Sequence, residues 1–227
     1  MTRDEHSDLH RYFDHAALKP EVTEQQIIRL CAEARRFGFF AVAVNPVWVT
    51  TAHKECTGSS VQVLSVSGFP LGAARTDVKV IEAVKAVSDG ASEIDMVANI
   101  GWLVDGQTKK AEEEIAEVRS NLPFNVILKV IIEAGKLQEQ QQLEATKAVL
   151  GGGAQFVKTC TGFFGGATVE QVRTLRRAAG QNLGVKASGG IRTLQQCQDL
   201  IDAGADRLGS SASADIMKEL AAKCPGA

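Results

Sequence analysis

Four ionisable residues lie within segments that otherwise have the apolar composition of buried strands. Lys158 ends one such run, in QFVKTCTGFFGG, and a loop of small residues follows it at once. The other three are Lys129 in NVILKVII, Lys186 in GVKASGGIRT and Asp95 in SEIDMVANIG. Burial of an unpaired ammonium is unfavourable, and the usual response is a lowered pKa that leaves the amine neutral. A neutral lysine amine is a nucleophile that forms a Schiff base with a carbonyl compound.

Taken alone, the Lys158 segment is equally compatible with a lysine that leaves the strand end and reaches into water, as most lysines do. The repetition of the pattern in four segments instead favours a polar centre on which buried parallel strands converge. In such a centre, burial and a like charge on Lys186 would both lower the pKa of Lys158. The sequence therefore predicts amine nucleophile chemistry at Lys158.

Strands alternate with helices along the whole chain. Short apolar runs predict strands at residues 12–16, 40–44, 61–66, 92–97, 125–132, 184–188 and 206–209, with a further strand ending at Lys158. Helices are expected between them, including residues 46–54, 107–120 and 136–150 and a helix from Thr76 that carries Val80, Val84 and Val87. Capping boxes predict helix starts at Thr23, Thr168 and Thr193, and Ser213 is expected to cap the last helix. No break in composition separates these units, so residues 1–227 are predicted to form a single domain.

Eight strand–helix units in a chain of 227 residues predict a (β/α)₈ TIM barrel, with an open doubly wound sheet as the alternative. In such barrels the active site lies at the C-terminal ends of the strands, and phosphate commonly binds the loops after strands seven and eight. Gly189 and Gly190 follow the seventh strand, and Ser210 and Ser211 follow the eighth. Glycines let backbone N–H groups approach an anion, and the helix capped by Ser213 would point its positive end at it. These loops predict a phosphorylated ligand.

Composition excludes several other classes of function. The net charge of −2 and the absence of a basic block argue against nucleic acid binding, and no apolar run approaches the ~20 residues of a membrane helix. The N-terminal sequence has no apolar segment of the kind found in signal peptides, which predicts a cytoplasmic protein. The histidines show no metal-binding spacing, so no metal is expected. The five cysteines are expected to be free thiols: Cys31, Cys56, Cys160, Cys197 and Cys224.

The motifs SEIDMVANIG, FVKTCTGF, GVKASGGIRT and RLGSS resemble those of deoxyribose-phosphate aldolase, and the resemblance runs from DHAALKP near the N-terminus through the last strand. It implies a (β/α)₈ barrel and a class I, Schiff-base aldolase that needs no metal or cofactor. The implied reaction is the reversible cleavage of 2-deoxy-D-ribose 5-phosphate to acetaldehyde and D-glyceraldehyde 3-phosphate, in the catabolism of deoxyribose phosphate.

The resemblance also implies a role for each residue. Lys158 would be the Schiff-base lysine, Lys186 its neighbouring lysine and Asp95 the acid that transfers protons. Four residues match the phosphate site of the family, namely Gly189, Gly190, Ser210 and Ser211. Lys129 is expected to be a structural partner that keeps Asp95 ionised. Asp14 is expected to support the groups that contact substrate, or to contact the substrate hydroxyls itself.

Two departures from the family pattern bear on these roles. Ala16 stands where family members often have threonine, and the chain ends in KCPGA without the C-terminal tyrosine of some members. By the same resemblance, the first departure would be expected to change substrate affinity and the second to change turnover. Two alternatives stay open: another Schiff-base aldolase of the transaldolase or ketose-phosphate type, and a non-catalytic barrel that binds a sugar phosphate. A homo-oligomer, a dimer or larger, is expected because dimers are the commonest soluble assemblies.

Overall fold

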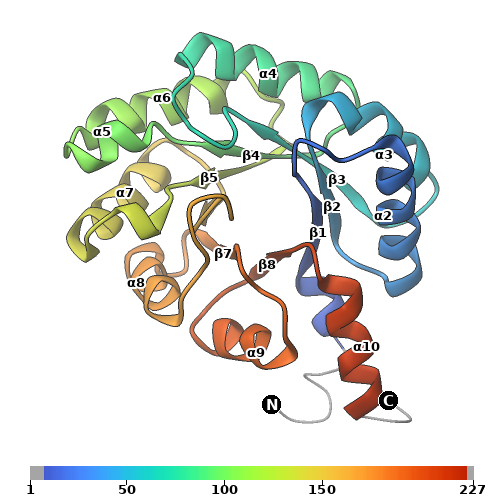
Figure 1. The fold of residues 1–227 in the computed structure, drawn as a ribbon. Helices are drawn as coiled ribbons and strands as arrows, with labels where there is room; N and C mark the ends of the chain where they lie inside the picture. Colours follow the sequence, from blue (N-terminus) through green and yellow to red (C-terminus); the bar gives the residue numbers. More distant parts are fainter. Residues whose placement is uncertain (1–7, 224–227) are drawn as a thin grey trace.

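The computed structural model, which describes residues 8–223, is a closed barrel of eight parallel strands surrounded by helices (Figure 1). Each strand pairs with the next in sequence, and β8 closes the barrel by pairing with β1. The predicted (β/α)₈ barrel is thereby confirmed and the open sheet excluded. His6, Cys224 and the C-terminal segment without tyrosine lie outside the described residues. The strands are β1 (Phe13–Ala17), β2 (Ala41–Val44), β3 (Gln62–Ser67), β4 (Glu93–Val97), β5 (Ile127–Ile131), β6 (Phe156–Lys158), β7 (Gly184–Ser188) and β8 (Arg207–Ser210).

The α-helices follow the strands in the chain and lie on the outside of the barrel (Figure 1). The α-helices are α2 (Glu24–Phe37), α3 (Val49–Cys56), α4 (Thr76–Ser88), α5 (Ile100–Val104), α6 (Thr108–Ser120), α7 (Glu139–Gly151), α8 (Val169–Ala179), α9 (Leu194–Asp202) and α10 (Ser213–Lys223). Three short 3₁₀ helices precede β1, α3 and α7, namely η1 (Leu9–Tyr12), η2 (Pro46–Trp48) and η3 (Ala134–Lys136). No helix within residues 8–223 is long and apolar enough to cross a membrane.

Local signals located most element ends to within a few residues. Capping boxes at Thr23, Thr168 and Thr193 begin α2, α8 and α9, as predicted. The prediction for Ser213 was wrong in detail, because α10 begins at Ser213 itself and its hydroxyl donates to the Ser210 carbonyl at 3.1 Å. The first strand starts one residue later than expected, since Tyr12 ends a 3₁₀ turn.

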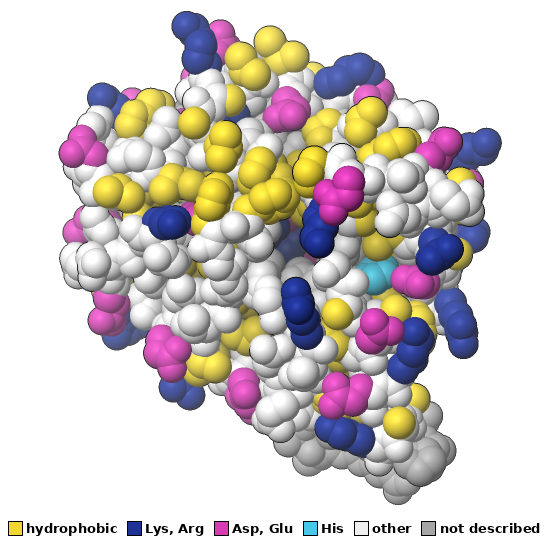
Figure 2. Space-filling view, in the orientation of Figure 1, with side chains coloured by type: hydrophobic (Ala, Val, Ile, Leu, Met, Phe, Trp, Pro, Cys, Tyr) yellow, Lys and Arg dark blue, Asp and Glu magenta, His cyan; other side chains and the backbone are white. Residues whose placement is uncertain are grey.

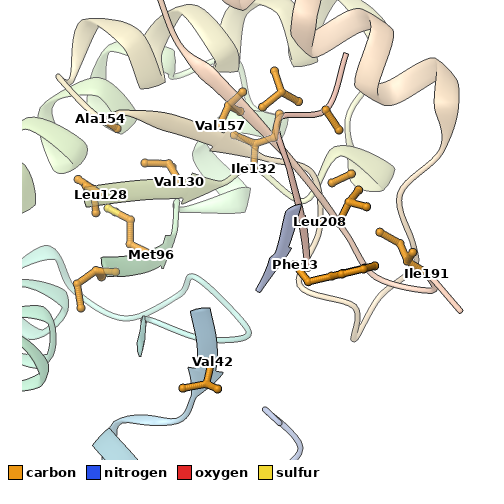
Figure 3. Close-up of a cluster of buried hydrophobic side chains, with 14 of the residues drawn as sticks. Phe13, Val42, Met96, Leu128, Val130, Ile132, Ala154, Val157, Ile191 and Leu208 are labelled. Atoms are coloured by element: carbon orange, nitrogen blue, oxygen red, sulfur yellow. The ribbon is translucent and has the colours of Figure 1, made fainter. Parts of the chain in front are cut away.

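The hydrophobic core lies mainly between the strands and the helices. Successive strand residues point to opposite faces, so every second residue faces the helices. Figure 3 shows part of this layer, in which Val130, Val157 and Leu208 from three strands are buried with Phe13 and Ile191. A much smaller apolar cluster of Ala41, Ala43 and Leu64 forms separately from it. The remaining inward positions are therefore available to charged side chains.

Helix α4 departs from the expected pattern. Its buried residues are Lys79, Ala83 and Ala86, whereas Val84 is 41% exposed. The Lys79 ammonium donates to Glu114 of α6 at 2.7 Å and to the Val97 carbonyl at 2.9 Å. The sequence carries no local signal for this buried pair, because its two residues lie on different helices.

Candidate active site

Strand register brings the two candidate lysines together. Lys158 of β6 and Lys186 of β7 are directly paired, and Asp95 of β4 is paired with Lys129 of β5. Side chains at paired positions of adjacent strands lie on the same face of the sheet. All four point into the barrel, and none is more than 3% exposed. The alternative in which Lys158 reaches into water is thereby excluded.

Asp95 is the centre of the ion-pair network. Its Oδ2 accepts from the Lys158 Nζ at 2.7 Å and from the Lys186 Nζ at 2.8 Å. Its Oδ1 lies 3.4 Å from the Lys129 Nζ and has no hydrogen-bond partner among the described residues. Lys186 also donates to Asp14, and Arg207 donates to the other oxygen of Asp14 at 3.1 Å. One carboxylate thus lies within ion-pair distance of three lysines.

Burial and charge change the pKa of Lys158 in the predicted direction. Burial is the largest influence and lowers it, the neighbouring Lys186 lowers it further, and Asp95 opposes both, which leaves a pKa of about 8 instead of 10.5. For Asp95, burial raises the pKa, but the charges of Lys158, Lys186 and Lys129 outweigh it and hold the pKa well below 3.8. The site therefore combines an ionised carboxylate with a lysine that readily gives up its proton.

Two residues of the ion-pair network, Glu93 and Arg207, were not predicted from the sequence. Glu93 accepts from Lys129, and Arg207 holds Asp14 while its guanidinium lies 3.3 Å from the centroid of the Phe40 ring. Glu93 could have been found, because it precedes Asp95 by two residues in one strand and must share its face. Arg207 gave no such signal, since an arginine at a strand start is ordinary.

A cavity of about 180 Å³ opens above these lysines, at the C-terminal ends of the strands. Lys158, Lys186 and Asp14 form part of its lining, as does Ala16. The four predicted phosphate-site residues also line it: Gly189, Gly190, Ser210 and Ser211. Asp95 and Lys129 are predicted site residues that do not line the cavity. They lie behind the lysines, and Asp95 is in contact with both.

The loops that are predicted to bind phosphate pack closely. Gly189 has a φ of +92°, and a Cβ there would lie 2.8 Å from the Gly165 carbonyl oxygen, so only glycine fits. The Ser210 hydroxyl donates to the Ile191 carbonyl at 2.7 Å and accepts from the Ala212 N–H at 2.9 Å. That hydroxyl is engaged within the protein, whereas Ser211 is exposed at the cavity.

Two cations on the cavity rim add positive charge that sequence analysis did not single out. Lys19 follows β1 and Arg192 follows the Gly189–Gly190 turn, and both are exposed. Within residues 8–223 no cluster of histidine, cysteine and carboxylate groups has the arrangement of a metal site. The cavity therefore has a cationic, glycine-rich end and a lysine-bearing floor.

Comparison with known proteins identifies the family. A family model described as DeoC/LacD family aldolase matches residues 9–217. The chain belongs to this aldolase family. A relative named deoxyribose-phosphate aldolase, from Natranaerobius thermophilus, is 48% identical over 213 residues that cover 93% of this chain and 97% of the relative. The resemblance found in the sequence motifs is thereby confirmed.

Solved structures agree with this assignment. A protein described as "QR15, an Aldolase" superposes on the chain with a TM-score of 0.90 at 40% identity, over 95% of this chain and 97% of the other. A structure described as the unique tetrameric structure of deoxyribose phosphate aldolase from Aeropyrum pernix gives a TM-score of 0.87 at 29% identity, over 97% and 93% of the two chains. The aldolase therefore shares its fold with its relatives over nearly their whole length.

Proposed function

We propose that this aldolase reversibly cleaves 2-deoxy-D-ribose 5-phosphate to acetaldehyde and D-glyceraldehyde 3-phosphate through a Schiff base on Lys158. The observation that carries the proposal is the environment of Lys158. Lys158 is 3% exposed, and its amine lies on the floor of a cavity whose other end suits a phosphate and has a pKa of about 8. The names of the relatives support the choice of sugar phosphate.

The lowered pKa supplies the nucleophile. At a pKa of 10.5 roughly 1 lysine amine in 3,000 is neutral at pH 7, whereas at about 8 roughly 1 in 10 is neutral. The charge balance of the network favours the neutral form as well. The barrel interior holds four basic side chains, Lys129, Lys158, Lys186 and Arg207, and three acidic ones, Asp14, Glu93 and Asp95. Loss of one proton from Lys158 therefore leaves equal numbers of positive and negative charges.

In the cleavage direction, the Lys158 Nζ attacks C1 of the open-chain aldehyde, and loss of water gives an iminium. Removal of the proton from the C3 hydroxyl breaks the C2–C3 bond, and the electron pair of that bond moves to the iminium. The products are D-glyceraldehyde 3-phosphate and an enamine of acetaldehyde on Lys158. Protonation of the enamine at C2 and addition of water release acetaldehyde and restore the amine.

Lys186 and Asp95 are the proposed proton-transfer groups. Lys186 lines the cavity and donates to Asp95 at 2.8 Å, so it can exchange protons with a bound substrate. Asp95 does not line the cavity, and we propose that it acts through the two lysines that it contacts. Lys129 would keep Asp95 ionised and Glu93 would hold Lys129 in place, while Asp14 fixes Lys186 from the opposite side.

The substrate phosphate is proposed to bind at the loops after β7 and β8. Gly189 and Gly190 offer backbone close to the cavity, and Ser211 is an exposed hydroxyl at its lining. The Ser210 hydroxyl is occupied by Ile191 and Ala212, so we expect Ser210 to contribute through its backbone. Arg192 adds a positive charge beside these loops.

Borohydride trapping tests the proposal. The protein is incubated with acetaldehyde, reduced, and digested, and the modified peptide is mapped by mass spectrometry. We expect a reduced two-carbon adduct on Lys158 that is absent from Lys158→Leu. A panel of 2-deoxyribose 5-phosphate and ketose phosphates then separates this reaction from those of other Schiff-base aldolases. Absence of any adduct in the folded wild-type protein would overturn the proposal in favour of a sugar-phosphate binder.

We further propose a homo-oligomer that works in the cytosol. The exposed apolar residues Val78 and Ile81 of α4 and Val104 of α5 support self-association. Figure 2 shows hydrophobic side chains gathered over this side of the molecule. The tetrameric relative from Aeropyrum pernix is consistent with it. Light scattering during size-exclusion chromatography gives the mass directly, and a monomer of 24.2 kDa would refute self-association.

A further inference from the structure

Glu133, just beyond the end of β5, has an unusual backbone. Its φ of 49° and ψ of 59° place it in the left-handed region, and it is the only non-glycine residue with positive φ within residues 8–223. That region is unfavourable for a residue with a Cβ. Glu133 is only 1% exposed. Such strain persists where surrounding contacts hold it, and it clusters at functional sites.

The Glu133 carboxylate holds the loop that follows Lys158. Its Oε2 accepts from the Thr161 N–H at 3.0 Å, and the Thr161 hydroxyl accepts from the Phe163 N–H at 3.2 Å. The next residue, Ala134, donates its backbone N–H to the Thr159 carbonyl at 2.8 Å. Thr161 and Phe163 line the cavity, whereas Glu133 does not. Glu133 can therefore affect the cavity only through this loop.

The loop after Lys158 also contacts Gly189–Gly190, the turn after β7 that is predicted to bind phosphate. The Ala167 N–H donates to the Gly189 carbonyl at 3.0 Å, and a Cβ on Gly166 would lie 2.7 Å from that oxygen. Gly162 also lies beside Gly189, since a Cβ on Gly189 would lie 3.1 Å from the Gly162 Cα. A displacement of residues 161–167 would therefore move Gly189 or open a gap beside it.

We propose that Glu133 is a positioning residue for the phosphate end of the cavity. Its carboxylate fixes residues 161–167, and these residues in turn fix Gly189. The inference rests on the proposed function, because it assigns the consequence to binding of the phosphate group and not to the chemistry at Lys158. Its left-handed backbone is the conformation that turns the carboxylate back towards Thr161.

A matched pair of variants tests the inference. Glu133→Gln and Glu133→Asn are both neutral amides, but the Asn side chain is one methylene too short to reach the Thr161 N–H. Asn also tolerates the left-handed backbone. Glu133→Gly keeps that backbone without any side chain and serves as a second short variant. For each, kcat and KM are measured with 2-deoxyribose 5-phosphate and with unphosphorylated 2-deoxyribose.

We expect Glu133→Asn and Glu133→Gly to raise KM for the phosphorylated substrate at least tenfold, with kcat and the kcat/KM for 2-deoxyribose changed less than threefold. Glu133→Gln should stay within threefold of the wild type. Equal losses on both substrates, or equal losses in Gln and Asn, would overturn the inference. Titration calorimetry with inorganic phosphate tests it without the reaction, and unchanged affinity in Glu133→Asn would also overturn it. Failure of the proposed function would show separately, as absence of the acetaldehyde adduct in the wild-type protein.

Discussion

Lys186 should set the pH range in which Lys158 is reactive. The Lys186 and Lys158 amines lie 2.8 and 2.7 Å from Asp95 Oδ2, so the two nitrogens are at most about 5.5 Å apart. Two unit charges at that separation interact by about 3 kcal/mol at an effective dielectric constant of about 20, which corresponds to about 2 pKa units. Removal of Lys186 also leaves Asp95 free to stabilise the Lys158 ammonium. Both effects raise the pKa of Lys158.

The variant Lys186→Met should therefore move the pKa of Lys158 upwards from about 8 by one unit or more. Because adduct formation requires the neutral amine, the midpoint of its pH dependence should rise by the same amount. The rate of borohydride-trapped adduct formation with acetaldehyde, measured from pH 6 to 11, gives this midpoint. Lys147→Met removes an exposed lysine of α7 and is the control. An unchanged or lower midpoint in Lys186→Met would refute the reasoning.

Three further predictions concern residues other than Lys158. Lys79→Met leaves the buried Glu114 without its cationic partner and should lower the free energy of unfolding by about 3–5 kcal/mol, measured by urea denaturation. The double variant Lys79→Met/Glu114→Leu should restore most of this loss. Gly189→Ala should raise KM for 2-deoxyribose 5-phosphate at least tenfold, while the acetaldehyde adduct still forms. The control Gly58→Ala is also at positive φ, but its added Cβ would meet no atom within 4 Å, so KM should not change. Burial raises the pKa of Asp14, but three cations outweigh it and leave that pKa below 3.8. Stability should therefore fall as the pH drops below about 4, and less steeply in Asp14→Asn, in urea denaturation from pH 3 to 7.

Local sequence patterns predicted the barrel and the lysines of the site. The segment GVKAS predicted β7 to the residue, because a short apolar run between a glycine and a Ser-Gly-Gly turn has few other interpretations. Lys158 could be located for the same reason. A lysine at the end of a buried parallel strand faces either water or the barrel interior, and the recurrence of the pattern decided between them.

The missed features depend on distant partners. Lys79 has the spacing of an ordinary solvent-facing helix residue, and only Glu114, 35 residues away, explains its burial. Arg207 is explained by Asp14, 193 residues away. The left-handed backbone of Glu133 follows from no local rule, since glycine or asparagine is the residue expected there. Pairings of this kind become visible only when the barrel closes.

The interior charges are divided unequally between the two halves of the chain. Every acid of the network comes from β1 or β4, whereas every base comes from β5, β6, β7 or β8. A fragment that ends after β4 would expose carboxylates on its inner face, and the complementary fragment would expose only cations. Two copies of the same half would bring like charges together, which disfavours a barrel made of identical halves. The two different halves attract, so a chain cut between β4 and β5 would select its proper complement.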